Sequence, residues 1–207
     1  VIIATGASAK YLGLESEQKY LQTGGGVSAC AVCDGFFYRG QETVIVGAGD
    51  SACEEAHYLS KLCTKVTMLV RKDEFRASKI MAERVKNTPN IEILFNTETD
   101  EVLGDGQLVT GVRVKNSVTG ELKEIPCTGF FVAIGHKPNT DLFIDQLAMH
   151  GGYLTVHSGT EGTATHTSLP GVFAAGDVTT IPYKQIIIAM GEGSKAALGA
   201  FDYLIRH

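Results

Sequence analysis

Short apolar runs and one stretch of helical periodicity dominate the first third of the chain. Val1–Ala4, Thr43–Val46 and Val66–Val70 are rich in β-branched residues and too short for helices, so we expect buried strands there. Between the last two runs, apolar side chains recur at positions 52, 56, 59 and 62, which is the period of a helix over Ser51–Leu62. The order strand, helix, strand predicts an α/β fold.

The apolar pattern changes after position 90. Residues 91–104 predict a strand followed by a loop. Alternation on both sides of residues 117–120, which includes Leu122 on the second side, predicts an antiparallel hairpin. Phe130–Ile134 predicts a further buried strand, and residues 135–140, Gly-His-Lys-Pro-Asn-Thr, predict a turn that could act as a hinge.

The last third of the chain predicts one strand and one helix. Val172–Ala175 is a short apolar run that ends at Gly176 and Asp177. A helix is expected from about Gln185 to Leu204, interrupted by the glycines at positions 191 and 193. A glycine beside an acid at a strand end can hold a polar cofactor group, although this pair is common in unrelated proteins.

Composition narrows the class of protein without deciding its activity. Of the 207 residues, 44% are hydrophobic and 20% charged, which suffices for a folded core. Glycine is abundant, with 24 residues, which favours tight turns and close backbone approaches to ligands. The net charge of −5 argues against a nucleic-acid partner. Because no apolar run approaches the roughly 20 residues that span a bilayer, and no signal peptide is seen, we expect no membrane association and a cytoplasmic location.

One pair of cysteines, Cys30 and Cys33, is closely spaced and is followed directly by Asp34. A zinc site would normally show a second pair of Cys or His ligands, so no metal is expected. A structural disulfide framework suits small secreted domains better than this chain. The favoured interpretation is therefore a dithiol that is oxidised and reduced, with its Cα atoms within about 7 Å. The remaining cysteines, at positions 53, 63 and 127, are expected to be buried apolar residues.

A glycine-rich turn joins the strand at 43–46 to the helix that follows. Gly47, Gly49 and Ala52 match the pattern Gly-x-Gly-x-x-Ala between a strand and a helix, which is the context that gives the pattern meaning. Gly47 would permit the tight turn, Gly49 would let a pyrophosphate approach the backbone, and Ala52 would keep the helix close to the sheet. The helix N-terminus offers free N–H groups to the phosphates. The alternative is a glycine turn in a domain without a ligand.

Cations follow the second strand of this unit. An NAD site usually carries an acid there for the ribose hydroxyl, whereas this chain has Arg71 and Lys72, with Arg76 shortly after. Cations at this place suit the 2′-phosphate of NADPH, and an arginine can bind that phosphate through two hydrogen bonds. A solvated basic turn is the alternative interpretation.

Six segments, in this order, resemble the low-molecular-weight thioredoxin reductases: ATGA, CAVCDG, GAGDSACEEA, RKDEFR, AIGHKPNT and GVFAAGD. The resemblance covers essentially the whole chain. It implies a flavoprotein with two dinucleotide-binding domains that uses NADPH and FAD, forms a homodimer and reduces a thioredoxin-like protein disulfide. In this family the dithiol lies within the NADPH domain, as the order of motifs has it here.

The resemblance also assigns roles to individual residues. Cys30 and Cys33 would be the redox pair, and Asp34 would manage protons at the dithiol and the flavin. The cofactor-binding residues would be Gly47, Gly49, Asp50, Ser51, Ala52, Arg71, Lys72, Arg76, Ile134 and Gly135 for NADPH, and Thr5, Gly6, Gly176, Asp177, Lys184, Gln185 and Ile186 for FAD. A rotation between domains is implied, with hinges at residues 135–140 and near Leu12–Glu17.

The family's first glycine-rich strand–helix unit, which holds the FAD pyrophosphate, has no counterpart in the sequence. We therefore expect residues 1–12 and 135–207 to be parts of an FAD domain and residues 13–134 to form the NADPH domain. The isolated chain is expected to be colourless and to bind FAD weakly. Two alternatives stay open. The C-terminal segment also resembles the flavoprotein subunit of alkyl hydroperoxide reductase, and a nucleotide-binding module without enzymatic activity is possible.

Overall fold

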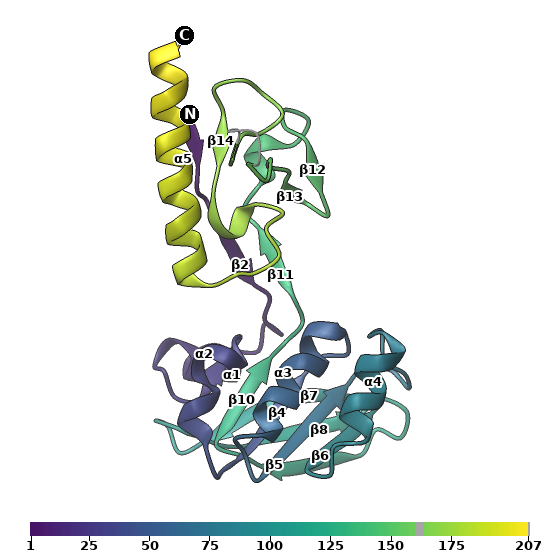
Figure 1. The fold of residues 1–207 in the computed structure, drawn as a ribbon. Helices are drawn as coiled ribbons and strands as arrows, with labels where there is room; N and C mark the ends of the chain where they lie inside the picture. Colours follow the sequence, from purple (N-terminus) through teal and green to yellow (C-terminus); the bar gives the residue numbers. More distant parts are fainter. Residues whose placement is uncertain (160–163, 207) are drawn as a thin grey trace. The chain divides into compact units, whose positions relative to one another are not determined.

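The computed structural model describes residues 1–159 and 164–206 (Figure 1). The chain divides into two compact units. Unit 1 comprises Val1–Ser8 and His136–His207, and unit 2 comprises Ala9–Gly135. The α/β class expected from the sequence is confirmed by the strands and helices of unit 2.

A parallel sheet forms the centre of unit 2. Each pair of neighbouring strands in it is parallel. The order across the sheet is β3 (Val27–Ser28), β10 (Gly129–Val132), β4 (Glu42–Val46), β5 (Lys65–Val70) and β6 (Ile91–Phe95). The strands expected at 43–46 and 66–70 are confirmed, and the strand expected at 130–134 ends at Val132.

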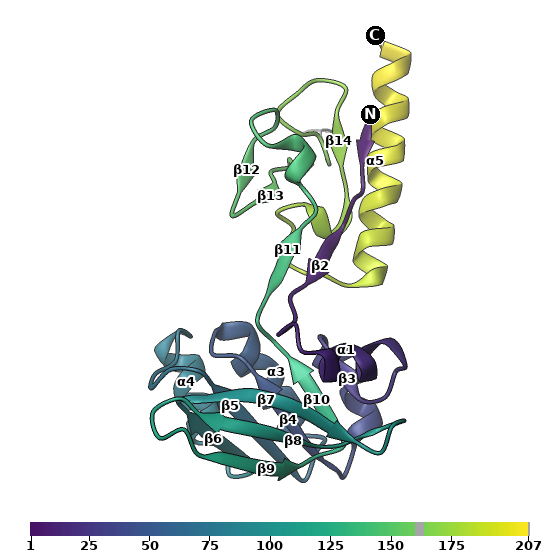
Figure 2. The ribbon, with the colours of Figure 1, turned by 180° about the vertical axis from the view of Figure 1, so that it is seen from behind.

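Both faces of this parallel sheet are covered. The helices α3 (Asp50–Ser60) and α4 (Lys79–Lys86) pack on one face, and Ile45, Met68 and Phe131 point toward them. On the other face lies an antiparallel sheet of β7 (Thr97–Gly104), β8 (Val109–Asn116) and β9 (Leu122–Pro126), which Figure 2 shows from its own side. Coverage of both faces explains why the central strands are continuous apolar runs instead of alternating ones.

The second half of the segment 91–104 is strand β7 and not the expected loop. Its residues are mostly polar because β7 is an edge strand of the antiparallel sheet. Its register with β8 shifts between Thr99 and Glu101, which disturbs the two-residue period that would have identified a strand. The hairpin of β8 and β9 is confirmed, but Leu122 is 55% exposed and does not join the core.

Three short helical segments complete unit 2. The helix α1 (Glu15–Gln22) contacts β7, and α2 (Ala31–Asp34) contacts α3. A 3₁₀ turn, Gly35–Tyr38, continues α2. The sequence pattern did not indicate α1 or α2, because an eight-residue helix and a four-residue helix give too few periods to be seen.

Unit 1 contains a parallel pair of short strands and a long helix. The strands are β1 (Ile2–Ile3) and β14 (Phe173–Ala174), and a 3₁₀ turn, Gly176–Val178, follows β14. The helix is α5 (Ile186–Arg206). The smaller elements are β12 (Met149–His150), β13 (Tyr153–Leu154), a 3₁₀ turn at Asp141–Phe143, and the two-stranded sheet of β2 (Ala7–Ala9) and β11 (His136–Pro138).

Two expectations for unit 1 were wrong in extent. The first strand is not fully buried: Ile3 is buried, but Ile2 is 45% exposed, because neighbouring side chains of a strand point to opposite faces. The glycines at 191 and 193 do not interrupt α5. A glycine costs about 1 kcal/mol relative to alanine within a helix, which weakens the helix without ending it.

The expected turn at residues 135–140 contains strand β11, which pairs with β2. Proline at position 138 is tolerated because a two-stranded ribbon has only edge strands. The second segment predicted to be a hinge, Leu12–Glu17, lies within unit 2. The carboxylate of Glu17 is fully buried and accepts hydrogen bonds from the N–H groups of Leu12 and Gly13, both at 2.9 Å. In the described part of the chain, no helix is long and apolar enough to cross a membrane.

Candidate functional site

The turn between β4 and α3 has the geometry that the glycine pattern predicts. Gly47 has a φ of +150°, and a Cβ there would lie 2.6 Å from the Cβ of Ala52 and against the carbonyl oxygen of Ala133. Ala52 itself is fully buried. A Cβ on Gly49 would meet no atom within 4 Å, so this residue faces open space. The turn therefore brings α3 close to the sheet at Gly47 and leaves its backbone accessible at Gly49.

A cavity of about 340 Å³ lies beside this turn in unit 2. It brings together five residues assigned to NADPH from the sequence: Gly47, Arg71, Lys72, Arg76 and Ile134. The other lining residues, which the sequence did not indicate, are Leu12, Val46, Ala48, Leu69 and Glu74. The cavity thus joins a glycine turn to a basic cluster at the carboxyl end of a parallel strand, where open α/β sheets bind their ligands.

The three cations of this cavity are available to an anion. Arg71, Lys72 and Arg76 are all exposed. Within residues 1–159 and 164–206, none of them forms an ion pair with a carboxylate. An arginine that is not already paired can offer its planar fork of N–H groups to a phosphate.

The loop that carries Arg76 is fastened to the glycine turn. The N–H groups of Arg76 and Ala77 donate to the carbonyl oxygen of Ala48, at 2.8 and 3.0 Å. The Asp50 carboxylate accepts from both the N–H and the hydroxyl of Ser78, at 2.9 Å each. Asp50 therefore orders this loop through its side chain, a role that the sequence did not indicate.

Three further residues assigned to NADPH stand at different places. Ser51 is exposed in the first turn of α3, whereas Ala52 is buried beneath it. Gly135 has a φ of +99° and its carbonyl oxygen accepts from the N–H of Lys10 at 2.9 Å. Gly135 follows Ile134 but is not among the residues that line the cavity.

Cys30 and Cys33 form a disulfide, with their Cα atoms 5.3 Å apart. The expected geometry is confirmed. Cys30 caps the N-terminus of α2, and the N–H of Cys33 donates to the sulfur of Cys30 at 3.2 Å. This N–H would favour a thiolate on Cys30 after reduction, because hydrogen bonds to the charged form stabilise it.

Ser28 joins the disulfide to Asp34. Its hydroxyl donates to the Asp34 carboxylate at 2.6 Å and accepts from the N–H of Cys30 at 3.0 Å. Ser28 is buried, so this contact is sheltered from solvent. The sequence identified Asp34 by its position after Cys33 but gave no signal for Ser28, because a single serine in a short strand is unremarkable.

Two tyrosines lie close enough to Asp34 to feel its charge. Burial, followed by the negative charge of Asp34, raises the pKa of the Tyr38 phenol above its ordinary value. The pKa of Tyr11 is raised by burial first, then by Glu17 and by Asp34. Both phenols therefore keep their protons at neutral pH and can donate hydrogen bonds in the neighbourhood of Asp34.

The other three cysteines are buried, as expected. Burial, aided by Asp50 and Glu54, raises the pKa of the Cys53 thiol to about 11. Burial and Glu42 raise the pKa of Cys127 to about 12, and burial raises that of Cys63. These thiols hold almost no thiolate at neutral pH and are chemically separate from the disulfide.

The residues assigned to FAD gather in unit 1. Thr5 and Gly6 follow β1, and Gly176 and Asp177 follow the parallel neighbour β14, so both pairs leave the same edge of the sheet. The first turn of α5 packs here, since a Cβ on Gly176 would lie 3.4 Å from the Cβ of Ala189. Gln185 precedes Ile186, and its carbonyl oxygen accepts from Ile188 and Ala189. The Lys184 ammonium donates to the carbonyl of Thr179, and burial lowers its pKa.

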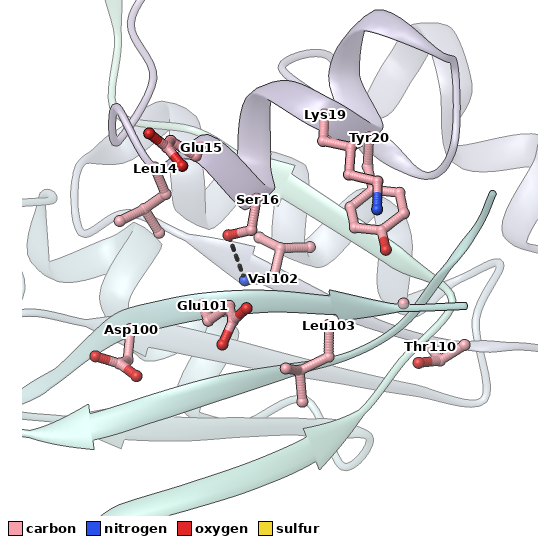
Figure 3. Close-up of a pocket in the computed structure, with 11 residues that line it drawn as sticks. Leu14, Glu15, Ser16, Lys19, Tyr20, Asp100, Glu101, Val102, Leu103 and Thr110 are labelled. Carbon is pink, nitrogen blue, oxygen red and sulfur yellow. Dashed lines mark hydrogen bonds between the residues drawn. The ribbon is translucent and has the colours of Figure 1, made fainter. Parts of the chain in front are cut away.

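A second cavity of unit 2 lies between α1 and β7 (Figure 3). Three of its lining side chains have defined polar partners. The Ser16 hydroxyl accepts from the N–H of Val102 at 3.0 Å, and Asp100 and Glu101 both pair with Arg113, at 2.6 and 2.7 Å. Within the described residues, Glu15 and Lys19 of this cavity form no ion pair.

Comparison with known proteins places the chain. A model of the pyridine nucleotide-disulphide oxidoreductase family matches residues 1–193. The chain belongs to this family. A thioredoxin reductase of Vibrio cholerae is 50% identical over 99% of the chain and 64% of its own length. A protein of Pseudomonas fluorescens named glucosaminate ammonia-lyase is 49% identical over the same shares. The chain thus spans about two thirds of the length of these relatives.

A solved structure agrees with the fold. A thioredoxin reductase from Giardia duodenalis matches 99% of the chain with a TM-score of 0.90 at 45% identity, and the match covers 65% of that protein. At this level of identity, the likeness extends beyond the fold to the sequence.

The glycine turn provides a test of the nucleotide cavity. Gly47→Ala should destabilise the protein by at least about 1 kcal/mol, because its Cβ would collide with Ala52 and with the backbone of Ala133. Gly49→Ala should leave stability within about 0.5 kcal/mol but weaken NADPH binding, since its Cβ would project into the open space where the glycine pattern predicts a phosphate. Urea unfolding and nucleotide titration measure the two effects. Equal stability of the two variants would contradict the assigned turn geometry.

The thiols provide a second test. After reduction of the folded protein, brief alkylation at pH 8 should modify Cys30 and Cys33, whereas the thiols with pKa values of about 11 and 12 stay unmodified. A thiol with a pKa of 11 is only about 0.1% thiolate at pH 8, by the definition of the pKa. Mass spectrometry of the alkylated peptides gives the answer, and the unfolded protein, in which all 5 cysteines react, is the control. Rapid labelling of Cys53 or Cys127 in the folded protein would contradict their burial.

Proposed function

We propose that the protein acts in thioredoxin reduction, with electrons passing from NADPH through FAD to the Cys30–Cys33 disulfide and on to a disulfide of a thioredoxin-like protein. The observation that carries this proposal is the formed disulfide in the same compact unit as the basic nucleotide cavity. The 50% identity to a thioredoxin reductase supports it. Disulfide reduction uses such a cysteine pair directly, which favours this activity over the lyase activity named for the Pseudomonas fluorescens relative.

The residues of unit 2 fit NADPH. The accessible backbone at Gly49 and the N-terminus of α3 suit the pyrophosphate, and Arg71, Lys72 and Arg76 suit the 2′-phosphate. In unit 1, the glycines of the Thr5-Gly6 and Gly176-Asp177 pairs have φ values of +70° and +76°, so the backbone turns tightly at the carboxyl ends of two parallel strands. This arrangement suits a dinucleotide such as FAD, which would supply the transfer between hydride and dithiol chemistry.

The chain's own residues account for the disulfide step. Reduction of the Cys30–Cys33 bond takes two electrons and two protons and yields two thiols. One thiolate then attacks a sulfur of the partner's disulfide and forms a mixed disulfide. The second cysteine attacks the sulfur of the first, which re-forms the Cys30–Cys33 bond and releases the partner as a dithiol. Asp34 is placed to hold or release the protons of these exchanges, with its carboxylate fixed by Ser28.

The surroundings of the disulfide suit a protein substrate. Val32, Phe36 and Phe37 are 57%, 63% and 73% exposed and lie on α2 and the 3₁₀ turn that follows it. Large apolar side chains in solvent beside a reactive group are typical of sites that bind another protein. The family resemblance extends the proposal to a homodimer in the cytoplasm, and the exposed apolar side chains of α5, such as Ile187, Leu198 and Phe201, would suit an apolar contact.

The preference for NADPH is the first test of this function. Replacement of both Arg71 and Lys72 by alanine should weaken NADPH binding at least about a hundredfold, because each charge-assisted contact contributes roughly 1.5–3 kcal/mol. NADH, which lacks the 2′-phosphate, should lose little affinity. Calorimetric titration of both nucleotides measures the effect. Lys61→Ala combined with Lys115→Ala removes the same charge from exposed sites outside the cavity and is the control. Equal losses for the two nucleotides would exclude the assignment.

The dithiol is the second test. Cys30→Ser or Cys33→Ser should abolish reduction of a thioredoxin disulfide. The assay uses a chimeric enzyme that joins this chain to the part of the Vibrio cholerae thioredoxin reductase outside the matched 64%. Bleaching of the flavin by NADPH should survive, because hydride transfer needs no sulfur. Asp34→Asn should keep the disulfide and slow its turnover by about 10²–10⁴-fold if the acid transfers protons. Stopped-flow spectroscopy separates the two half-reactions. Normal thioredoxin reduction by the Cys30→Ser enzyme would refute the proposed function.

A further inference from the structure

Three N–H groups of the disulfide turn, those of Cys30, Ala31 and Cys33, have a defined partner. The N–H of Cys30 donates to Ser28, and that of Cys33 donates to the sulfur of Cys30. The N–H of Ala31, between them, donates to the Glu55 carboxylate at 3.1 Å. Ala31 is fully buried, so without this acceptor its N–H would be left unpaired away from water.

Glu55 reaches the disulfide turn from a different element. It lies on α3, whose N-terminus carries the glycine turn of the nucleotide cavity, and α3 packs against α2. Five positions separate Asp50 from Glu55, which is about 7–8 Å along a helix. The neighbouring acid, Glu54, is exposed, whereas Glu55 is half-buried between the two helices.

The charge of Glu55 is not needed for its hydrogen bond. A glutamine oxygen could accept from Ala31 equally well. In the described part of the chain, no cation forms an ion pair with Glu55. Burial, opposed by the hydrogen bond from Ala31 and reinforced by Glu54, raises the pKa of this carboxyl group. An acid that is costly to bury, where an amide would suffice, suggests that its charge has a use at the disulfide.

We propose that Glu55 is a positioning residue that anchors the Cys30–Cys33 turn to α3 and that its negative charge holds back thiolate formation after the disulfide is reduced. The proposal rests on the function proposed above, because it concerns the reactivity of the same dithiol. A negative charge near a thiol disfavours its thiolate, and the thiolate is the form that attacks a disulfide. Glu55 and Asp34 both disfavour the thiolate, whereas the N–H of Cys33 favours a thiolate on Cys30.

Substitutions separate the charge from the hydrogen bond. Glu55→Gln keeps an acceptor for Ala31 and removes the charge, and Glu55→Ala removes both. Glu54→Gln removes an exposed charge from the adjacent position and is the matched control. The reduced chain is alkylated with iodoacetamide between pH 5 and 10, and the modification of Cys30 and Cys33 is quantified separately by mass spectrometry. This measurement needs neither flavin nor nucleotide.

The Glu55→Gln protein should be alkylated at pH 7 at least about threefold faster than the wild type, with the midpoint of its pH profile moved to lower pH. Its equilibrium with reduced and oxidised glutathione should shift toward the dithiol, since a more acidic thiol stabilises the reduced form. Glu54→Gln should behave as the wild type. A structural role alone would move neither readout in the glutamine variant, so equal rates and equal equilibria in Glu55→Gln and the wild type would overturn the proposal.

The two levels of inference fail separately in this experiment. If the reduced Cys30–Cys33 pair forms no disulfide in oxidised glutathione, the proposed function itself is refuted. If the pair cycles normally and only the effect of Glu55→Gln is missing, the function stands and the role of Glu55 falls. Loss of folding in Glu55→Ala would support the anchoring of Ala31, while a folded Glu55→Ala protein with wild-type alkylation would contradict both parts of the proposal.

Discussion

The close approach of α3 to β4 is the constraint on which both reactive regions of unit 2 depend. It is possible only because residue 47 has no side chain and residue 52 has only a methyl group. The turn that leads into α3 lines the cavity with the three cations through Gly47 and Ala48. The second turn of α3 brings Glu55 to the backbone of the disulfide turn. This single packing contact therefore fixes where α3 begins. The glycine turn before α3 lines the nucleotide cavity, and Glu55 on α3 contacts the disulfide turn.

Solvent exposure, more than local sequence, decides which cysteines of this protein are reactive. Cys53 lies on the same helix as Glu55, yet its side chain is fully buried against the sheet and its thiol is hard to ionise. Cys30 and Cys33 lie on a turn whose N–H groups are free to be used by side chains, because a helix of four residues satisfies few of its own donors. Neighbouring side chains can therefore change the reactivity of Cys30 and Cys33, whereas a thiol within a packed helix is not open to such contacts.

The sequence was most informative where function depends on residues close together in the chain. The glycine turn, the cations after β5 and the cysteine pair are each local patterns, and the structure brings the first two into one cavity. No sequence pattern indicated Ser28, Glu55 or Ser78, because their roles come from partners on other elements. Strand β7 was missed for a related reason. An edge strand with an irregular register has a polar sequence, so only its pairing with β8 reveals it.

The charges on the segments next to α3 suit two different tasks, the binding of phosphates and the control of a dithiol. Phosphates require positive charge, and the cavity at the start of α3 has three cations that no carboxylate neutralises within the described residues. A dithiol that must wait for its partner benefits from the opposite sign, because each nearby carboxylate keeps the sulfurs protonated. Asp34 and Glu55 supply that charge: Asp34 is bonded to Ser28, and Glu55 accepts from the N–H of Ala31. The helix α3 therefore lies between the nucleotide cavity, whose positive charge favours anions, and the disulfide turn, whose negative charge disfavours a thiolate.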